Sequence, residues 1–381
     1  MRATYLGPVP HLFFQKTTYD LALERAFTRL GQRRIRCKQS QIVKIYATCP
    51  QSRDVARELY TERVIDVARW SEEAGCHGML VYTDNGIADP WLVSQLVIQH
   101  TAKLVPLVAV QPAYMTPLSA AKMVASLGWM HGRAVALNMV AGGFKNDLLA
   151  LGDPTPHDER YERLIEYVAI IRSLLADQGP VTHEGKHYRV RNLRMAPSLP
   201  PHLMPDILVS GSSAAGEAAA VTMGAISVTY PEPIGEATTT APNDGRTRGV
   251  RVGIIARETA DEAWEVAYER FPDTRAGRIT HGLAMKVSDS QWHKQLSSLD
   301  EKPATPDHPY WLGPFQTSAT FCPYLVGTYD RVADELARYV GLGASVFILD
   351  IPPSREELVH TGIAIRRAQT IAQNTHAHAS R

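Results

Sequence analysis

Two strand-to-helix junctions in this chain collect residues that can bind a phosphate and a planar heterocycle without a metal ion. The first runs from a β-like segment, residues 134–140, through a polar loop into residues 157–161. The second is a short apolar run that turns at a Ser-Gly-Ser-Ser sequence into a helix. A helix N-terminus offers unpaired N–H groups and the positive end of a dipole, so this turn is a candidate anion site and indicates an organic cofactor. Its residues are Ser210, Gly211, Ser212 and Ser213.

The composition argues against several kinds of partner. The 381 residues include 40 Lys and Arg against 39 Asp and Glu, so no global field favours a nucleic acid or an acidic membrane surface. The longest apolar runs are interrupted well short of the ~18 residues that a membrane span needs. The N-terminus lacks the pattern of a secretory signal. We therefore expect a cytoplasmic protein with no nucleic-acid or membrane partner.

The cysteines and histidines show no spacing typical of a metal site. Cys37, Cys49, Cys76 and Cys322 are far apart and form no Cys-x-x-Cys pair. The 14 histidines include no His-Glu-x-x-His pattern. Neither a disulfide framework nor a structural zinc site is expected, and no metal is assigned.

From about Gln41 the chain alternates strand-like and helix-like segments. Eight repeats of this kind predict an α/β fold, a (β/α)8 TIM barrel with insertions. A doubly wound open sheet is disfavoured because no Gly-x-Gly-x-x-Gly turn follows an early strand. The predicted strands cover residues 42–48, 78–83, 103–114, 133–140, 207–209, 225–229, 250–256 and 345–351.

A single barrel domain is predicted for residues 41–373, preceded by an N-terminal extension at 1–40 and followed by a frayed tail at 374–381. Three insertions interrupt the alternation. The first is β-hairpin-like, the second is a Gly/Thr/Pro/Asn-rich linker, and the third has no clean period. They cover residues 179–201, 235–249 and 271–321.

Several motifs, in order along residues 41–371, resemble the bacterial luciferase-like flavin-dependent monooxygenases, and among them the two-component alkanesulfonate monooxygenases. They include Gly78-Met-Leu-Val-Tyr-Thr83, Asn138-Met-Val-Ala-Gly142, Arg160-Tyr161, Ser210-Gly-Ser-Ser213 and Arg257-Glu-Thr259. The resemblance implies an insertion-bearing (β/α)8 barrel that uses reduced FMN and O2 to oxygenate a small organic substrate. It also implies a separate NAD(P)H:flavin reductase as partner, and we expect a homodimer or homotetramer.

The resemblance also implies which residues hold the cofactor. Asn138 would contact the flavin ring edge or ribityl chain, although it could instead stabilise a turn. Tyr161 would bind the flavin phosphate, with a core tyrosine as the alternative. The serines of the turn would hold the phosphate, cap the helix, or do both. The full predicted set is Tyr82, Thr83, Asn138, Tyr161, Ser210, Gly211, Ser212 and Ser213.

Candidates for proton transfer, oxygen activation or anion binding are Cys49, Asp84, Asn85, Tyr230 and Arg251. Arg251 either binds an anionic group or closes a structural salt bridge, because a barrel-lining arginine is costly unless paired.

Other positions depart from the sulfonate enzymes. Those enzymes carry histidine where this chain has Cys49 and Gly253, and cysteine where it has Ile87. A lid arginine aligns near Ser318 and a late tyrosine near Pro352. The substrate is therefore expected to differ from a simple alkanesulfonate.

Two other functions remain open at this stage. Relatives on the same fold use the deazaflavin F420 for hydride transfer, so an F420-dependent oxidoreductase is the nearest alternative. A non-catalytic flavin-binding subunit is the second, and the absent sulfonate residues would support it. No substrate follows from these residues alone.

Overall fold

The computed structural model describes residues 43–143, 145–211, 213–233, 246–287, 296–297 and 308–378. The extension predicted for residues 1–40, the turn residue Ser212 and most of the predicted 235–249 linker lie outside this part of the chain. Contacts divide the chain into residues 1–42 and 43–381. The second unit carries all the described helices and strands.

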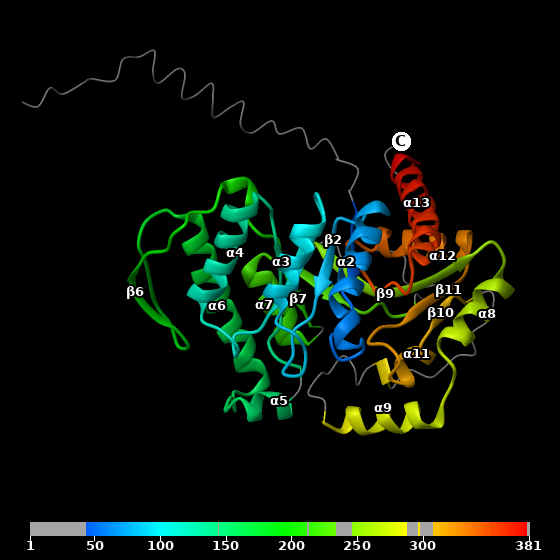
Figure 1. Ribbon diagram of the computed structural model, residues 1–381, viewed down its shortest axis with the longest axis horizontal. Coiled ribbons are helices and arrows are strands. Elements are labelled where there is room, and N and C mark those ends of the chain that lie inside the picture. The colour runs from blue at the N-terminus through cyan, green and yellow to red at the C-terminus, as the bar shows by residue number, and fades with distance from the viewer. Residues whose placement is uncertain are drawn as a thin grey trace, which may run out of the picture. The chain divides into compact units, whose positions relative to one another are not determined.

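The first part of this unit alternates strands and helices and ends with a hairpin and one further strand (Figure 1). Its elements are β1 (Lys44–Thr48), α2 (Arg57–Glu73), β2 (Gly78–Val81), α3 (Pro90–His100), β3 (Val105–Val110), α4 (Pro117–His131), β4 (Ala136–Met139), α5 (Lys145–Ala150), α6 (His157–Ala176), β5 (Val181–Glu184), β6 (Arg189–Leu193) and β7 (Ile207–Ser210).

The second part carries the longest strand and a group of short elements before the last two helices. Its elements are α7 (Ala214–Met223), β8 (Ile226–Thr229), β9 (Arg248–Arg257), α8 (Ala260–Arg270), α9 (Arg275–Val287), β10 (Tyr310–Trp311), α11 (Gly313–Gln316), β11 (Tyr324–Thr328), α12 (Tyr329–Gly341), β12 (Ala344–Leu349) and α13 (Arg355–His378).

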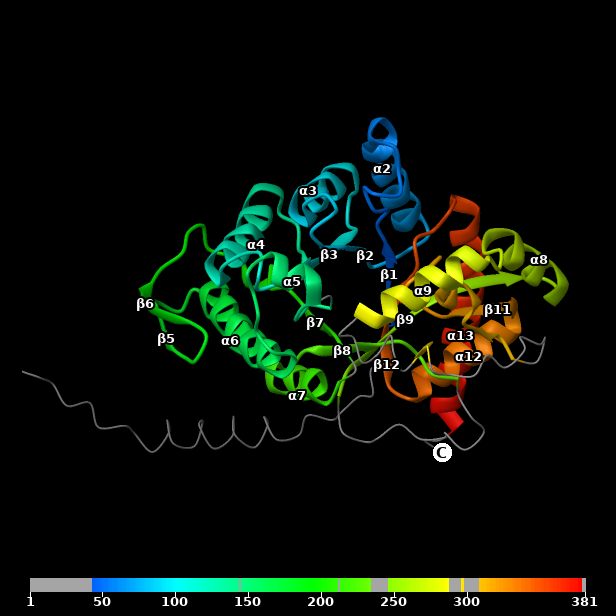
Figure 2. The ribbon, with the colours of Figure 1, turned by 90° about the horizontal axis from the view of Figure 1, so that it is seen from below.

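Eight parallel strands close into a barrel in the order β1-β2-β3-β4-β7-β8-β9-β12, with β12 pairing back to β1. The helices lie outside this ring of strands (Figure 2). The predicted (β/α)8 fold and its eight strands are confirmed. Because all eight strands run parallel, their C-terminal ends meet at one face of the barrel, where sites of this fold are built.

Local sequence sets the helix ends. At α4, the Thr116 hydroxyl accepts the Ser119 N–H at 3.2 Å, and Pro117 occupies the first helical position, where its missing N–H is harmless. The helix ends at Gly132, which adopts the left-handed conformation with φ of 62°.

The barrel interior is filled below its mouth. A cluster of buried apolar side chains occupies it, with Tyr46 and Leu107 fully buried at its centre. The contributing strands are β1, β2, β3, β4, β7, β8 and β12. Space for a ligand is therefore left at the ends of the strands, as in other packed barrels of this kind.

Two stretches differ from the prediction. The described part of 271–321 is not irregular, because it contains α9, β10 and α11. The last helix continues to His378 instead of fraying at 374, since Ala364, Ala368 and Ala372 keep a buried face at helical spacing. The predicted hairpin within 179–201 is confirmed as the antiparallel pair β5–β6. Among the described residues, no helix is both long and apolar enough to cross a bilayer.

The close approach of β2 to its neighbours gives a test of the packing. A Cβ at Gly78 would lie 2.2 Å from the Val105 carbonyl oxygen and 2.6 Å from the Tyr46 ring. We expect Gly78→Ala to lower the free energy of unfolding by about 1–3 kcal/mol through overpacking. Gly341→Ala, where a Cβ meets nothing within 4 Å, is the matched control. Chemical denaturation measures both, and equal stability of the two variants would contradict this packing.

Candidate functional site

A cleft at the C-terminal ends of the strands holds about 740 Å³ of empty space, open solvent included; we call it the mouth cavity. Its walls come from the segments after β1, β2, β3, β4 and β8, from β9 itself and from Phe321 before β11. Five residues predicted from the sequence line it, namely Tyr82, Thr83, Asp84, Tyr230 and Arg251. The structure thus brings together side chains that are up to about 170 positions apart in the chain.

Arg251 and Tyr82 face each other across one wall of the mouth cavity. The guanidinium carbon of Arg251 lies 5.0 Å from the centre of the Tyr82 ring, a cation–π distance. The Nε and Nη2 atoms of Arg251 and the hydroxyl of Tyr82 are buried and have no hydrogen-bond partner among the described residues. Buried donors without partners are costly, so this wall is suited to an anionic or strongly accepting group.

Behind Arg251 lies a second layer of buried polar groups. Burial raises the pKa of the Cys322 thiol, the nearby Asp350 carboxylate raises it further, and the Arg251 charge opposes the rise. The Tyr324 hydroxyl donates a 2.8 Å hydrogen bond to Asp350. Burial also raises the pKa of Tyr230 well above its usual value. Cys322 and Tyr230 are therefore protonated at neutral pH, and the thiol is not a thiolate nucleophile.

The loops around the opening are tied to one another. Asn85 accepts a 2.7 Å hydrogen bond from the Tyr114 hydroxyl and donates to the Asp147 carbonyl oxygen at 3.2 Å. Asp84 pairs with Arg53. The loops that follow β1, β2, β3 and β4 are therefore connected by side chains, and Asp84 is held as an ion-paired carboxylate.

A neighbouring cavity of about 590 Å³ shares Thr83 and Asp84 with the mouth cavity. Ile87, which stands where sulfonate enzymes carry cysteine, lines it together with Trp91. The shared walls also include Gln111 and Tyr114. The two hollows thus meet at the loops that follow β2 and β3.

The predicted cofactor residues of β4, α6 and β7 form a second cluster, which we call the cradle: Asn138, Tyr161, Ser210, Gly211 and Ser213. The Ser210 hydroxyl donates to the Asn138 side-chain oxygen at 2.8 Å. Ser213 caps α7 by accepting the Gly216 N–H at 3.1 Å. A Cβ at Gly211 would lie 2.4 Å from the Tyr161 hydroxyl, so only glycine lets this phenol reach the turn.

The sequence model of the luciferase-like monooxygenase family matches residues 44–345. The chain belongs to the luciferase-like monooxygenase family. A curated relative, the 4-(gamma-L-glutamylamino)butanoyl-[BtrI acyl-carrier protein] monooxygenase BtrO of Niallia circulans, is 34% identical over 307 residues, which is 79% of this chain and 89% of the relative. Membership makes this protein an oxidoreductase of the monooxygenase type, as predicted.

Proteins with solved structures of similar fold are named for different reactions. The EDTA monooxygenase EmoA from Chelativorans sp. BNC1 superposes with a TM-score of 0.65 at 17% identity, covering 88% of this chain and 94% of its own. The oxygenating constituent of 3,6-diketocamphane monooxygenase from Pseudomonas putida, in complex with FMN, superposes with a TM-score of 0.59 at 15% sequence identity. The match covers 84% of this chain and 98% of that one. An F420-dependent secondary alcohol dehydrogenase superposes with a TM-score of 0.58 at 15% sequence identity. The match covers 86% of this chain and 99% of that one. At these identities the likeness establishes the fold alone.

The structure does not bring Cys49 to the mouth cavity. Its side chain is 1% exposed and packs within the apolar cluster between β1, α2 and α12. Burial raises the pKa of this thiol, so it remains protonated and cannot act as a base at neutral pH. The role in proton transfer that was expected from its place after β1 is therefore not supported.

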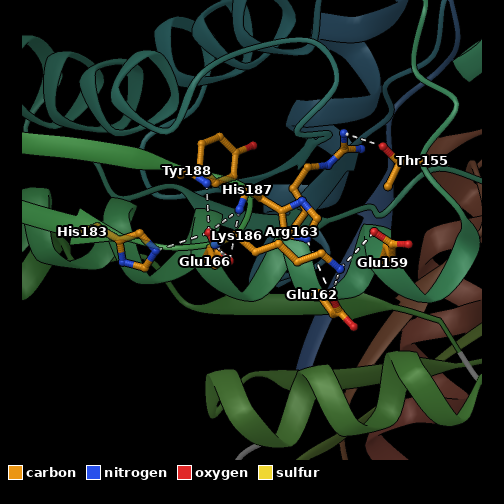
Figure 3. A network of polar contacts seen from close by, with 9 residues as sticks. All are labelled: Thr155, Glu159, Glu162, Arg163, Glu166, His183, Lys186, His187 and Tyr188. Carbon is orange, nitrogen blue, oxygen red and sulfur yellow. Dashed lines mark hydrogen bonds and ion pairs between the residues drawn. The ribbon is translucent and has the colours of Figure 1, made fainter.

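Helix α6, which presents Tyr161, also holds the β5–β6 hairpin (Figure 3). The Glu166 carboxylate accepts the backbone N–H groups of Lys186 at 2.9 Å and Tyr188 at 3.0 Å, and His187 also donates to it. His183 lies 3.4 Å from the same carboxylate. Burial alone would raise the pKa of Glu166, but these donors lower it overall.

Several residues of the site were missed from the sequence. Gln51, Gln111 and Tyr114 line the mouth cavity, and each follows a strand, so their positions alone were a usable signal. Asp350 gave the same signal, because it directly follows β12, whereas Cys322 precedes β11 and its relevance comes only from contacts across the fold.

The hairpin anchor gives a second test. In Glu166→Gln the amide offers one acceptor oxygen and no charge, so the hairpin amides should lose about 1.5–3 kcal/mol of protection. Because the folded pKa of Glu166 is lowered, wild-type protection should be complete above the ordinary glutamate pKa of about 4.3 and fall as pH drops through the lower folded value. Hydrogen exchange of residues 183–193 measures both effects.

Glu162→Gln on the same helix is the control, because among the described residues this exposed carboxylate pairs with the side chains of Lys186 and His187 and not with the hairpin backbone. It should leave exchange of the hairpin amides unchanged. If both variants exchanged alike, Glu166 would not be the anchor.

Proposed function

We propose that this protein is the oxygenating component of a two-component monooxygenase that uses reduced FMN and O2. A separate NAD(P)H:flavin reductase would supply the reduced flavin. The observation that supports this proposal is the presence, at the C-terminal end of one barrel, of the cradle and of a cavity whose wall has donors without partners among the described residues. Family membership supports the same reaction class.

The donor set of the cradle fits a flavin phosphate. Tyr161 is 7% exposed and burial raises the pKa of its phenol, so it remains a hydrogen-bond donor at neutral pH. Gly211 leaves room for this phenol beside the start of α7, where backbone N–H groups and the helix dipole favour an anion. Asn138 and Ser210 would hold the ribityl chain or ring edge, with Tyr82 and Thr83 on the cavity side. Ser212 remains a candidate by its place in the turn.

When bound, reduced FMN supplies the electrons that activate O2, so that one oxygen atom enters the substrate and the other leaves as water. The side chains of this protein would bind and orient the cofactor and the substrate, and would exclude water from the site. Arg251 and Tyr82 offer three buried donor atoms to an acceptor at the cavity wall. Tyr230 and Phe321 line the same space and limit its hydration. Asp84 and Asn85 fix the loops around the opening.

For the substrate, we propose an acyl group that carries a carboxylate and is presented by an acyl-carrier protein. The curated relative acts on such a substrate. The free donors of Arg251 suit a carboxylate, and the substitutions at Gly253 and Ile87 argue against a simple alkanesulfonate. An F420-dependent reaction remains the second candidate, because a neighbour of this fold uses that cofactor.

The phosphate role of Tyr161 gives a direct test. We expect Tyr161→Phe to raise the Kd for FMN by about 10- to 100-fold, the effect of one hydrogen bond to a charged group, and to leave the Kd for riboflavin unchanged. Tyr167→Phe is the matched control, since Tyr167 lies on the same helix, is fully buried, and its hydroxyl has no partner among the described residues. Fluorescence titration measures the affinities of the wild type and of both variants for FMN and for riboflavin.

An equal loss for FMN and riboflavin would remove Tyr161 from the phosphate site. Tighter binding of F420 than of FMN by the wild-type protein would favour the second candidate function.

The reaction is tested with a 4-(gamma-L-glutamylamino)butanoyl thioester under ¹⁸O2, with reduced FMN supplied by a flavin reductase. We expect one ¹⁸O atom per product molecule by mass spectrometry. Arg251→Met should raise KM by about 10- to 100-fold for this substrate, but not for a butanoyl thioester, which lacks the carboxylate. Absence of ¹⁸O from every product would reject the proposed reaction on this class of substrate.

A further inference from the structure

Helix α9 has an inner face that packs on the protein and an outer face that does not. On the inner face, a Cβ at Gly277 would lie 2.4 Å from the Thr317 carbonyl oxygen. The His281 ring packs edge-on against Phe315 of α11, with centroids 4.9 Å apart. The helix is therefore anchored along one side, and its other side has no structural role in the described part of the chain.

The outer face is apolar and basic. Ile279 is 56% exposed and Leu283 is 59% exposed, one helical turn apart. Arg275 and Lys286 lie on the same side at helical spacing, are exposed, and have no ion-pair partner among the described residues. Arg278 pairs with Asp273 at 2.7 Å. The helix itself contains no Asp or Glu, so its own charges are all positive.

The outer face lies near the opening of the barrel. The loop after α11, on which α9 packs, leads to Phe321, a lining residue of the mouth cavity. Figures 1 and 2 both place α9 at the same end of the barrel as α5, the short helix that follows β4. A partner bound to α9 would therefore sit beside the entrance through which a substrate must pass.

We infer that the outer face of α9 is the docking site for an acidic acyl-carrier protein, which delivers the acyl substrate into the mouth cavity. This inference rests on the proposed function. A substrate tethered to a carrier reaches the cavity only if the carrier binds close to the mouth. Carrier proteins present acidic helices with a few exposed apolar side chains. These complement two exposed aliphatic residues flanked by two cations that have no ion-pair partner in the described part of the chain.

The test uses purified holo acyl-carrier proteins of the host, fluorescently labelled and titrated with the full-length enzyme. Anisotropy should report binding by the wild-type enzyme that weakens as salt rises from 50 to about 200 mM. Arg275→Glu with Lys286→Glu should weaken binding at least tenfold and flatten the salt dependence. Ile279→Ser with Leu283→Ser should weaken binding at least tenfold with the salt dependence retained.

The matched control is Val359→Ser with Arg366→Glu on α13, which also removes one exposed aliphatic side chain and reverses one exposed cation. It should bind the carrier like the wild type. Unchanged FMN affinity and circular dichroism in all variants would show that they fold.

No carrier binding by the wild type, or equal binding by wild type and α9 variants, would overturn the inference. So would self-association through this face without carrier binding. The assay involves no turnover, so it separates the two proposals. Carrier binding that depends on α9 without oxygenation would reject only the reaction, whereas oxygenation of the free thioester without docking would reject only the α9 site.

Discussion

The site depends on one strand, β9, which has two different neighbours along a single edge. Residues 248–250 of β9 pair with β8 and close the barrel. From Gly253 to Arg257 the same edge pairs with β11 instead. Arg251 lies between these two pairings, while its other edge remains paired with β12 opposite Ile348. The barrel wall divides at this level, and Arg251 lines the cavity that opens there.

The diverging half of β9 is held by ion pairs whose side chains are largely, but not fully, buried. Glu357 on α13 pairs with Arg257 at the end of β9 and with Arg270 at the end of α8, the latter at 2.6 Å. Removing one partner would leave the other charge without compensation in a largely desolvated position. The contact therefore ties the end of β9 to the helices outside it.

The sequence was sufficient for the framework and for half of the site. The spacing of apolar residues and the turn residues between segments predicted the eight strands, because barrel strands are short apolar runs separated by helices. The cradle was also predictable, since Asn138 and Ser210 both end strands and meet at the same face. The errors have physical causes. Cys49 also follows a strand, but its side chain turns into the apolar layer under the helices, and a strand pattern does not specify which side a residue faces after the strand ends. Cys322 joins the site entirely by tertiary contact.

Gly253 shows why residues of the mouth cavity and residues of the cradle differ in how freely they can be substituted. A Cβ at this position would lie 2.3 Å from the Tyr324 ring, so no larger residue fits while the ring stays in place. The ring is fixed in turn, because its hydroxyl donates a hydrogen bond to Asp350 and the ring makes an edge-to-face contact with Phe271, with centroids 4.9 Å apart. A histidine of the kind carried by sulfonate enzymes could return only if Tyr324 and its partners changed together. The cradle, by contrast, depends on the small size of Gly211 and on a helix start, and neither responds to the substrate. A cofactor site of this construction can persist while the opposite wall is rebuilt for another substrate.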